Sequence, residues 1–312
     1  MKHVFITGCP RSGTTMLASM IGNEASSVVT PESDFFIDFV YKFLQNKSQK
    51  SNILEYLNFL KSNYRFKQWY IDENNINHSS ESINFSDYKI LIENTVHLYV
   101  KEHLNTLSHE LTRVDHTPSS ILNFEILNEL FPKSKFIFIV RDPRAIYASV
   151  KKLDWGANTA LRLAEIWNEY TIHYYSVKKR FPERIHLIKY EDILLNPVSS
   201  IKELCQFTNL TYHDSMIEGK GFKIPNYTAS QHDLVGKKLD KSRIEKWKKE
   251  LSQKDVLIIE SKSKTIMQAF GYKIDESVNY RITFKDKFEM LLKEFYYYFK
   301  NKIHKKNREN KV

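Results

Sequence analysis

The chain of 312 residues is 42% hydrophobic and 27% charged, which is the composition of an ordinary globular protein. No apolar run approaches the roughly 18 residues that a membrane-spanning helix requires, and the apolar segment at residues 4–6 is too short for a secretory signal. We therefore expect a cytoplasmic protein. Because no Pro/Gly/Ser-rich linker separates two cores, one domain with insertions is the expected organisation.

The formal net charge of +10 is concentrated in residues 220–249 and 284–311. The rest of the chain is close to neutral, so the charge does not indicate a nucleic-acid surface spread over the protein, and we expect no nucleic-acid partner. The two cysteines, Cys9 and Cys205, fit a reducing compartment. They provide neither a disulfide framework nor a metal-ligand cluster, so we expect no bound metal.

Strand and helix signals alternate along the chain, which favours an α/β fold with a mainly parallel sheet covered on both faces by helices. Predicted strands occupy residues 3–7, 27–30, 112–115, 135–140 and 184–189. Predicted helices occupy residues 14–22, 34–45, 50–63, 119–131, 143–153, 157–180, 199–208, 254–270 and 284–303. The polar stretch at residues 72–82 predicts a loop.

A glycine-containing segment at residues 8–13 follows the first predicted strand and precedes the first predicted helix. It has the frame of the phosphate-binding Walker loop, but Thr14 stands where that loop has its lysine. Nucleotide triphosphatases need this lysine on the β- and γ-phosphates. The loop amides, the start of the helix and Arg11 still favour one phosphate. The sequence therefore predicts phosphate binding without triphosphate hydrolysis.

A second group of polar residues follows the predicted strand at residues 135–140. Asp142 and Pro143 predict the N-cap and first residue of a helix, which argues against a magnesium-binding role for Asp142. Ligands of open α/β sheets bind beyond the carboxyl ends of the strands, where Arg141 falls. Arg141 and Ser149 are therefore candidates for binding a second phosphate beside the first.

The sequence Pro-Arg-Ser-Gly-Thr-Thr at residues 10–15, with Arg-Asp-Pro-Arg at residues 141–144, resembles the sulfotransferase superfamily, in particular the branch that includes tyrosylprotein sulfotransferases and many bacterial enzymes. The resemblance covers residues 1–272 and implies a P-loop-like three-layer sandwich with a mainly parallel central sheet and helical insertions. It implies 3′-phosphoadenosine 5′-phosphosulfate (PAPS) as the donor, used without a metal. By position, it assigns the 5′ side to Arg11, Ser12, Gly13, Thr14 and Thr15, and the 3′-phosphate to Arg141 and Ser149.

The resemblance also implies a general base and a cation beside the transferred group. Glu32, after the second predicted strand, matches the glutamate base of the tyrosylprotein branch, although from local sequence alone it would only complement a helix dipole. His116 occupies the place of a family lysine that stabilises the departing oxygen. It would need a partner such as Asp115 to raise its pKa and keep it protonated. Otherwise Arg11 carries this role alone and His116 contacts the acceptor.

Two further residues match family positions near the nucleotide. Tyr190, after the last predicted strand, is either a cofactor contact or an ordinary aromatic residue at a strand end. Lys237 belongs to a basic segment that closes over the nucleotide in relatives. Gly219, Gly221 and Pro225 would let this segment move as a lid that excludes water. The alternative is a solvated basic loop.

Residues 273–312 lie outside the resemblance and form a basic amphipathic tail. Such a helix either docks on the core or makes peripheral contact with an anionic membrane surface, and the sequence leaves both interpretations open. Apolar residues recur there at helical spacing among lysines and tyrosines: Phe284, Phe288, Leu291, Leu292, Phe295, Phe299 and Ile303.

The sequence thus predicts a sulfotransferase that transfers the sulfuryl group of PAPS to an acceptor hydroxyl. The expected acceptor is a bacterial surface glycan or its lipid-linked precursor, with the enzyme in the cytoplasm, at the inner face of the cell membrane if the tail lies on it. A protein tyrosine or a small molecule is the alternative acceptor. A more distant alternative is a P-loop small-molecule kinase, which would bind ATP with Mg²⁺, and a third is a non-catalytic nucleotide-binding scaffold. No feature of the sequence indicates an oligomeric state.

Overall fold

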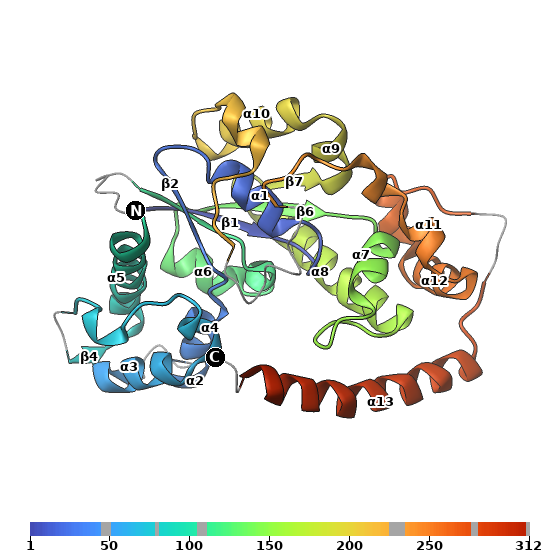
Figure 1. Ribbon diagram of the computed structural model, residues 1–312, viewed down its shortest axis with the longest axis horizontal. Coiled ribbons are helices and arrows are strands. Elements are labelled where there is room, and N and C mark those ends of the chain that lie inside the picture. The colour runs from blue at the N-terminus through green and yellow to red at the C-terminus, as the bar shows by residue number, and fades with distance from the viewer. Residues whose placement is uncertain (45–50, 79–80, 105–110, 225–234, 276–279, 310–312) are drawn as a thin grey trace.

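A computed structural model describes residues 1–44, 51–78, 81–104, 111–224, 235–275 and 280–309 (Figure 1). Its centre is a parallel sheet of five strands in the order β2-β5-β1-β6-β7. The five predicted strands are confirmed to within one residue at each end, because each is a short run that suits a buried parallel strand. The strands are β1 (Lys2–Thr7), β2 (Ser27–Thr30), β5 (Thr112–Asp115), β6 (Lys135–Val140) and β7 (Ile185–Lys189).

Helices cover both faces of the sheet, because alternate side chains of each strand point to opposite sides. Ile137 and Ile139 of β6 belong to an apolar cluster with the helices of one face. Phe136 and Phe138 belong to the cluster of the other face, where Phe138 stacks on Tyr174 with 4.7 Å between ring centroids. The predicted three-layer α/β fold is confirmed. The first face carries α1 (Thr14–Ile21), α9 (Tyr190–Leu195) and α10 (Pro197–Thr208), and the second carries α6 (Phe124–Leu130) and α8 (Ala160–Arg180), with α12 (Gln253–Ala269) packed on α8.

A helical insertion lies between β2 and β5 in the chain and occupies the lower left of Figure 1. Its core is aromatic: Phe39 packs on Tyr56 and on Tyr88, with centroid distances of 5.0 and 5.1 Å. The insertion comprises α2 (Asp34–Phe43), β3 (Ser51–Asn52), α3 (Ile53–Ser62), α4 (Tyr64–Lys67), a 3-10 turn at Glu73–Asn75, β4 (Ser82–Ile83) and α5 (Phe85–His103).

Helix α5 is the main element that the sequence analysis did not predict. It contains β-branched and asparagine residues of modest helix propensity, and its buried residues spread over much of its circumference. Packing of Tyr88, Ile92 and Val96 into the aromatic core stabilises it instead. The predicted loop at residues 72–82 is confirmed for residues 72–78 and 81, with a 3-10 turn inside it, while residues 79–80 lie outside the described residues and residue 82 begins β4.

The remaining helices lie after β5. The helix predicted at residues 119–131 is divided into a 3-10 turn (Pro118–Ile121) and α6. The predicted N-cap role of Asp142 is confirmed, since its Oδ1 accepts a hydrogen bond from the Arg144 amide at 2.9 Å at the start of α7. Among the described residues, no helix combines the length and apolar sequence needed to cross a membrane. These elements are α7 (Pro143–Val150), 3-10 turns at Asp214–Glu218 and Lys241–Ile244, α11 (Trp247–Glu250) and α13 (Phe284–Glu309).

A buried ion pair fixes the carboxyl end of β5. The side chains of Arg113 and Asp115 are both 1% exposed, and Nη2 of Arg113 lies 2.5 Å from Oδ2 of Asp115. Arg113 also donates to Ser33 Oγ at 2.8 Å, and Asp115 accepts the amide of Thr117 at 2.8 Å. This network joins the end of β5 to the start of α2, and therefore positions the chain segments that carry Glu32 and Asp34.

Replacing Arg113 with methionine is expected to lower the free energy of unfolding by about 3–5 kcal/mol, because the Asp115 carboxylate is left buried without its cation. Urea unfolding followed by circular dichroism measures this loss. The double variant Arg113→Met/Asp115→Asn is expected to lose less, since it also removes the uncompensated charge. Equal losses in the single and double variants would contradict the role given to the ion pair.

Candidate active site

The loop that joins β1 to α1, residues 8–13, follows a path that requires glycine at two positions. Gly8, with φ of 154°, runs so close to β6 that an added Cβ would lie 2.3 Å from the carbonyl oxygen of Ile139. Gly13, with φ of 107°, packs against Tyr190, and its Cβ would lie 2.7 Å from that ring. Arg11 also has a positive φ, 74°, which is unfavourable for a residue with a side chain. The β1–α1 loop is therefore held tightly between β6 and Tyr190.

The N-terminus of α1 faces a cavity and has no side-chain cap within the described structure. Gly13 is its N-cap residue, and Gly13, Thr14 and Thr15 line the cavity. First-turn amides that lack an intrahelical partner, together with the positive end of the helix dipole, suit an anion. Ser12 does not line the cavity surface. It is fully buried within the loop, as its 0% exposure shows.

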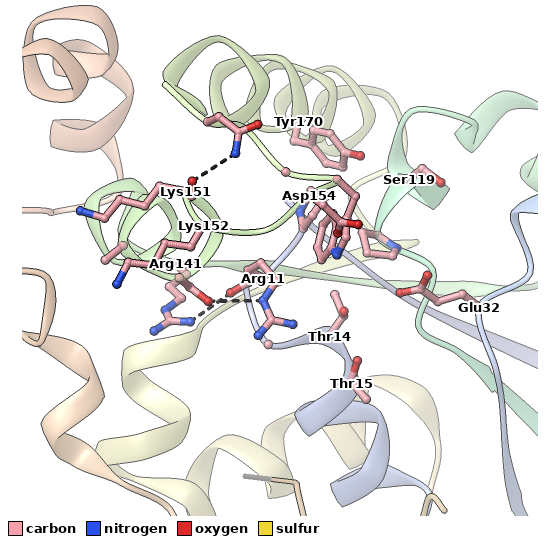
Figure 2. A pocket seen from close by; sticks show the side chains of 18 of the residues that line it. Arg11, Thr14, Thr15, Glu32, Ser119, Arg141, Lys151, Lys152, Asp154 and Tyr170 are labelled. Atoms are coloured by element: carbon pink, nitrogen blue, oxygen red, sulfur yellow. Dashed lines mark hydrogen bonds between the residues drawn. The ribbon is translucent and has the colours of Figure 1, made fainter. Parts of the chain in front are cut away.

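Four of the predicted nucleotide-binding residues meet where β1, β6 and β7 end. Nε of Arg11 donates to Oγ of Ser149 at 3.3 Å, and Nη1 of Arg141 donates to the carbonyl oxygen of Arg11 at 3.0 Å (Figure 2). The guanidinium of Arg141 lies over the ring of Tyr190, 4.1 Å from its centroid. The structure thus brings together residues from three separate segments of the chain.

Further basic side chains line this end of the cavity and were not predicted from the sequence. Figure 2 shows Lys151 and Lys152 on the same side of Arg11 as Arg141. Arg243 and Lys246 come from the basic segment identified in the sequence. In the sequence, Arg243 and Lys246 stood out only as part of a locally basic segment, because no motif distinguished them from their neighbours.

The predicted lid residue Lys237 does not join this group in the described structure. Its side chain is exposed and is not part of the cavity lining, although Val235 is. Pro225, which was expected to help the lid move, lies outside the described residues. Contact between Lys237 and the nucleotide stays a prediction.

Glu32 lies on the opposite side of the cavity, near Ser119 (Figure 2). Its Oε2 is 2.9 Å from Nη1 of Arg65, and Nε of Arg65 is 3.8 Å from Oδ2 of Asp34. Burial raises the pKa of Glu32, Arg65 opposes this shift, and the Asp115 carboxylate adds to it. Burial and the neighbouring Glu32 raise the pKa of Asp34 to about 6. Two carboxylates thus share one guanidinium, and neither Asp34 nor Arg65 was predicted.

His116 is buried at 4% exposure and does not line the described cavity. Its ring packs edge-on against Phe222, with 5.2 Å between centroids. Burial lowers the pKa of His116 to about 4 although Asp115 opposes this shift, so its imidazole is neutral at pH 7. Asp115 is already paired with Arg113. Asp115 therefore does not keep the His116 imidazole protonated. The structure also does not bring His116 together with the other predicted site residues.

The basic residues around Arg11 and the carboxylates around Glu32 line one cavity with a volume of about 1440 Å³. Basic residues and the N-terminus of α1 form one end, while carboxylates and aromatic rings surround Glu32 at the other. We refer to these as the donor end and the acceptor end. Other residues that line the cavity and that no sequence motif indicated are Asp34, Asp38, Tyr64, Arg65, Ser119, Asp154, Trp155, Tyr170, Tyr297 and Tyr298.

Comparison with known proteins identifies the family. A profile described as the sulfotransferase family matches residues 3–214. The chain therefore belongs to the sulfotransferase family, and the resemblance noted in the sequence is confirmed. This match includes the β1–α1 loop, Glu32, Arg141, Ser149 and Tyr190.

Two solved structures share the fold. The sulfotransferase domain from the curacin biosynthetic pathway is 19% identical, with a TM-score of 0.58 and coverage of 88% of this chain and 99% of that domain. The sulfotransferase domain from the Synechococcus PCC 7002 olefin synthase is 16% identical, with a TM-score of 0.60 and coverage of 88% and 96%. At these identities the likeness shows the fold.

A relative in sequence is an uncharacterized protein of Aquifex aeolicus (strain VF5), which is 26% identical over 257 residues. The match covers 80% of this chain but 30% of that protein. The chain thus spans less than a third of the length of this relative.

Asp34→Asn is expected to stabilise the protein relative to wild type near pH 7.5 and to have little effect near pH 4. Aspartate in the unfolded chain has a pKa of about 3.9, whereas Asp34 in the folded protein has a pKa of about 6. Between these two pH values the unfolded chain has released a proton that the folded protein still holds. Wild-type stability therefore falls as pH rises through this window, and the variant avoids the loss. Because the side chain is 32% exposed and shares Arg65, we expect a gain on the order of 1 kcal/mol.

Thermal unfolding of both proteins at the two pH values measures this difference. Asp72→Asn, which replaces an exposed carboxylate outside the cavity, serves as the matched control. A stability difference between Asp34→Asn and wild type that does not change with pH would contradict the raised pKa.

Proposed function

We propose that the protein transfers the sulfuryl group of PAPS to the hydroxyl group of an acceptor. The observation that carries this proposal is the convergence of three features in one cavity. These are the uncapped N-terminus of α1 after a loop without lysine, Arg141 and Ser149 beside Arg11, and Glu32 at the opposite end. A kinase or triphosphatase would need a lysine where this chain has Thr14.

The donor end fits a ligand with two separate anionic groups. Arg141 lines the cavity, and its Nε is buried without a hydrogen-bond partner in the described part of the chain. Leaving such a group unsatisfied costs about 1–3 kcal/mol, and a phosphate oxygen would supply the missing partner. We assign the 5′ side of the donor to the β1–α1 loop with Thr14 and Thr15, and its 3′-phosphate to Arg141 and Ser149.

The chain's own residues divide the work of transfer between the two ends. Bound at the donor end, PAPS supplies the activated sulfuryl group. Glu32 accepts the proton of the acceptor hydroxyl, and Arg65 holds the Glu32 carboxylate in position. The α1 amides and Arg11 stabilise the negative charge that develops on the departing phosphate oxygen. His116 is buried and neutral, so it provides no positive charge for the departing oxygen. Arg11 therefore takes the role of the family lysine.

We further propose an acceptor rich in hydroxyl groups, such as a bacterial surface glycan or its precursor. At the acceptor end, the carboxylates of Asp34 and Asp38 can accept hydrogen bonds from hydroxyls, and the rings of Tyr64 and Tyr170 offer flat apolar faces for a sugar ring. The volume of about 1440 Å³ exceeds the roughly 300–1,000 Å³ of a typical single-ligand pocket, which supports room for two substrates.

A tyrosyl peptide or a small molecule is the alternative acceptor. The two solved sulfotransferase domains described above come from a biosynthetic pathway and from an olefin synthase. Transfer of radiolabelled sulfuryl groups from PAPS to separated glycan, lipid, protein and small-molecule fractions distinguishes these acceptors. Radiolabel found only in the protein fraction or only in the small-molecule fraction would exclude a glycan as the acceptor.

Arg141→Ala is expected to weaken binding of adenosine 3′,5′-bisphosphate, the product form of the donor, by about 10- to 150-fold, the effect of losing a hydrogen bond to a charged group. Isothermal titration calorimetry without added metal measures the affinity. Arg180→Ala, at an exposed arginine paired with Glu125, should bind like wild type. Unchanged affinity in Arg141→Ala would show that Arg141 is structural, and binding of ATP with Mg²⁺ in place of the bisphosphate would support a kinase.

Glu32→Gln is expected to lower kcat by about 10²- to 10⁴-fold, because an amide cannot accept the acceptor's proton. Affinity for the bisphosphate should stay unchanged, since Glu32 lies at the other end of the cavity. Radiolabel transfer and calorimetry measure the two quantities, with Glu125→Gln at an exposed site as control. A variant that retains the wild-type kcat would show that Glu32 is not the base.

A further inference from the structure

Within the described residues, helix α13 contacts the rest of the protein along one side. Lys254 of α12 lies 2.8 Å from Asp286 and 2.9 Å from Glu289. Thr159 donates to Glu294 at 2.6 Å, and Asp286 and Met290 are buried. These contacts fix the orientation of the helix, so that its opposite side points away from the protein.

The opposite side of α13 is apolar and exposed. Phe284 is 84% exposed, and Leu291 and Phe295 are each 65% exposed, which is unusual for large apolar side chains that lie so close together. We call this surface the α13 apolar face. It consists of Phe284, Phe288, Leu291, Leu292, Phe295 and Phe299, all more than half exposed, which recur at the three- and four-residue spacing of one helix side.

The acidic residues of α13 face the protein body, and two of its lysines flank the α13 apolar face. Asp286, Glu289 and Glu294 are engaged with Lys254 and Thr159 of the protein body. The lysines among the described side chains of this helix remain exposed. These are Lys285, Lys287, Lys293, Lys300 and Lys302. Lys302 lines the cavity, and Lys293 follows Asp286 by two helical turns on the side that faces the protein body. Lys285 and Lys287 precede Phe288 and Leu291 by three and four residues, and so place positive charge beside the α13 apolar face.

We propose that the α13 apolar face lies in the surface of an anionic membrane. A helix of 26 residues with an apolar face rich in phenylalanine and leucine, flanked by lysines, has the pattern of helices that lie in the plane of the interface. Its charged residues make it unsuited to crossing the bilayer, but lysines beside the apolar face attract anionic headgroups. Of the two alternatives left by the sequence, the helix both docks on the core and presents a membrane-binding side.

A second copy of the chain is the other occupant to consider for this face. A two-fold dimer would place identical surfaces together, so the exposed lysines of one α13 would approach those of its copy. Like charges so arranged oppose association, whereas an anionic membrane compensates the same charges. Charge complementarity thus favours the membrane.

Helix α13 also connects the membrane surface to the candidate active site. Tyr297, Asn301 and Lys302 line the cavity, and Asn301 donates to Oδ1 of Asn158 at 2.9 Å. The cavity would therefore open beside the membrane, where a hydroxyl-bearing acceptor carried on a lipid could enter. This consequence rests on the proposed function, whereas membrane binding itself does not.

Cosedimentation with lipid vesicles tests the proposal on the full chain. Wild-type protein is expected to bind vesicles of phosphatidylcholine with phosphatidylglycerol, and to bind phosphatidylcholine alone much more weakly. Phe288→Asn/Leu292→Asn should reduce partitioning about tenfold or more, because two side chains lose apolar burial. Leu54→Asn/Ile90→Asn changes two equally exposed apolar residues outside α13 and should bind like wild type.

Lys285→Glu/Lys287→Glu tests the charge contribution and should weaken binding to the anionic vesicles most strongly at low salt. Circular dichroism confirms that each variant is folded. Absence of wild-type binding, or equal binding by the Phe288/Leu292 variant, would overturn the proposal. So would a wild-type dimer in solution that this variant converts to a monomer, since the face would then belong to a second copy. Affinity for adenosine 3′,5′-bisphosphate, measured separately, reports on the proposed function.

Discussion

The close packing of the β1–α1 loop is the constraint on which the site depends. Gly8 passes against the backbone of β6, and Gly13 passes against the ring of Tyr190. In this position the loop presents the first turn of α1 to the cavity and holds the Arg11 carbonyl within reach of Arg141. Because all five strands are parallel, their carboxyl ends lie at one edge of the sheet, and residues far apart in the chain meet there.

The cavity is electrostatically divided. Cations and helix amides gather at the donor end, whereas Glu32 and Asp34 share Arg65 at the acceptor end. Such a division suits a reaction in which a strongly anionic donor must be neutralised while a carboxylate receives a proton. The charged network of Arg113 and Asp115 lies beneath the acceptor end and fixes its framework without occupying the cavity.

The sequence predicted those parts of the fold and site that depend on local patterns. The five strands are short apolar runs, and the loop and the Arg-Asp-Pro-Arg segment are contiguous motifs, so Arg11, Arg141, Ser149 and Tyr190 were found in advance. Helix α5 was missed because its stability comes from tertiary packing. Arg65, Arg243 and Lys246 were missed because only the fold brings them to the cavity. His116 matched a family position, but burial, which a motif does not report, leaves it neutral.

In the proposed reaction, one cavity holds a bis-phosphorylated adenosine at its donor end. A crystal structure of the protein with adenosine 3′,5′-bisphosphate tests this most directly. We expect the 5′-phosphate at the amides of Gly13, Thr14 and Thr15, and the 3′-phosphate within hydrogen-bond distance of Arg141 and Ser149. A nucleotide bound with its phosphates away from both positions would contradict this proposal.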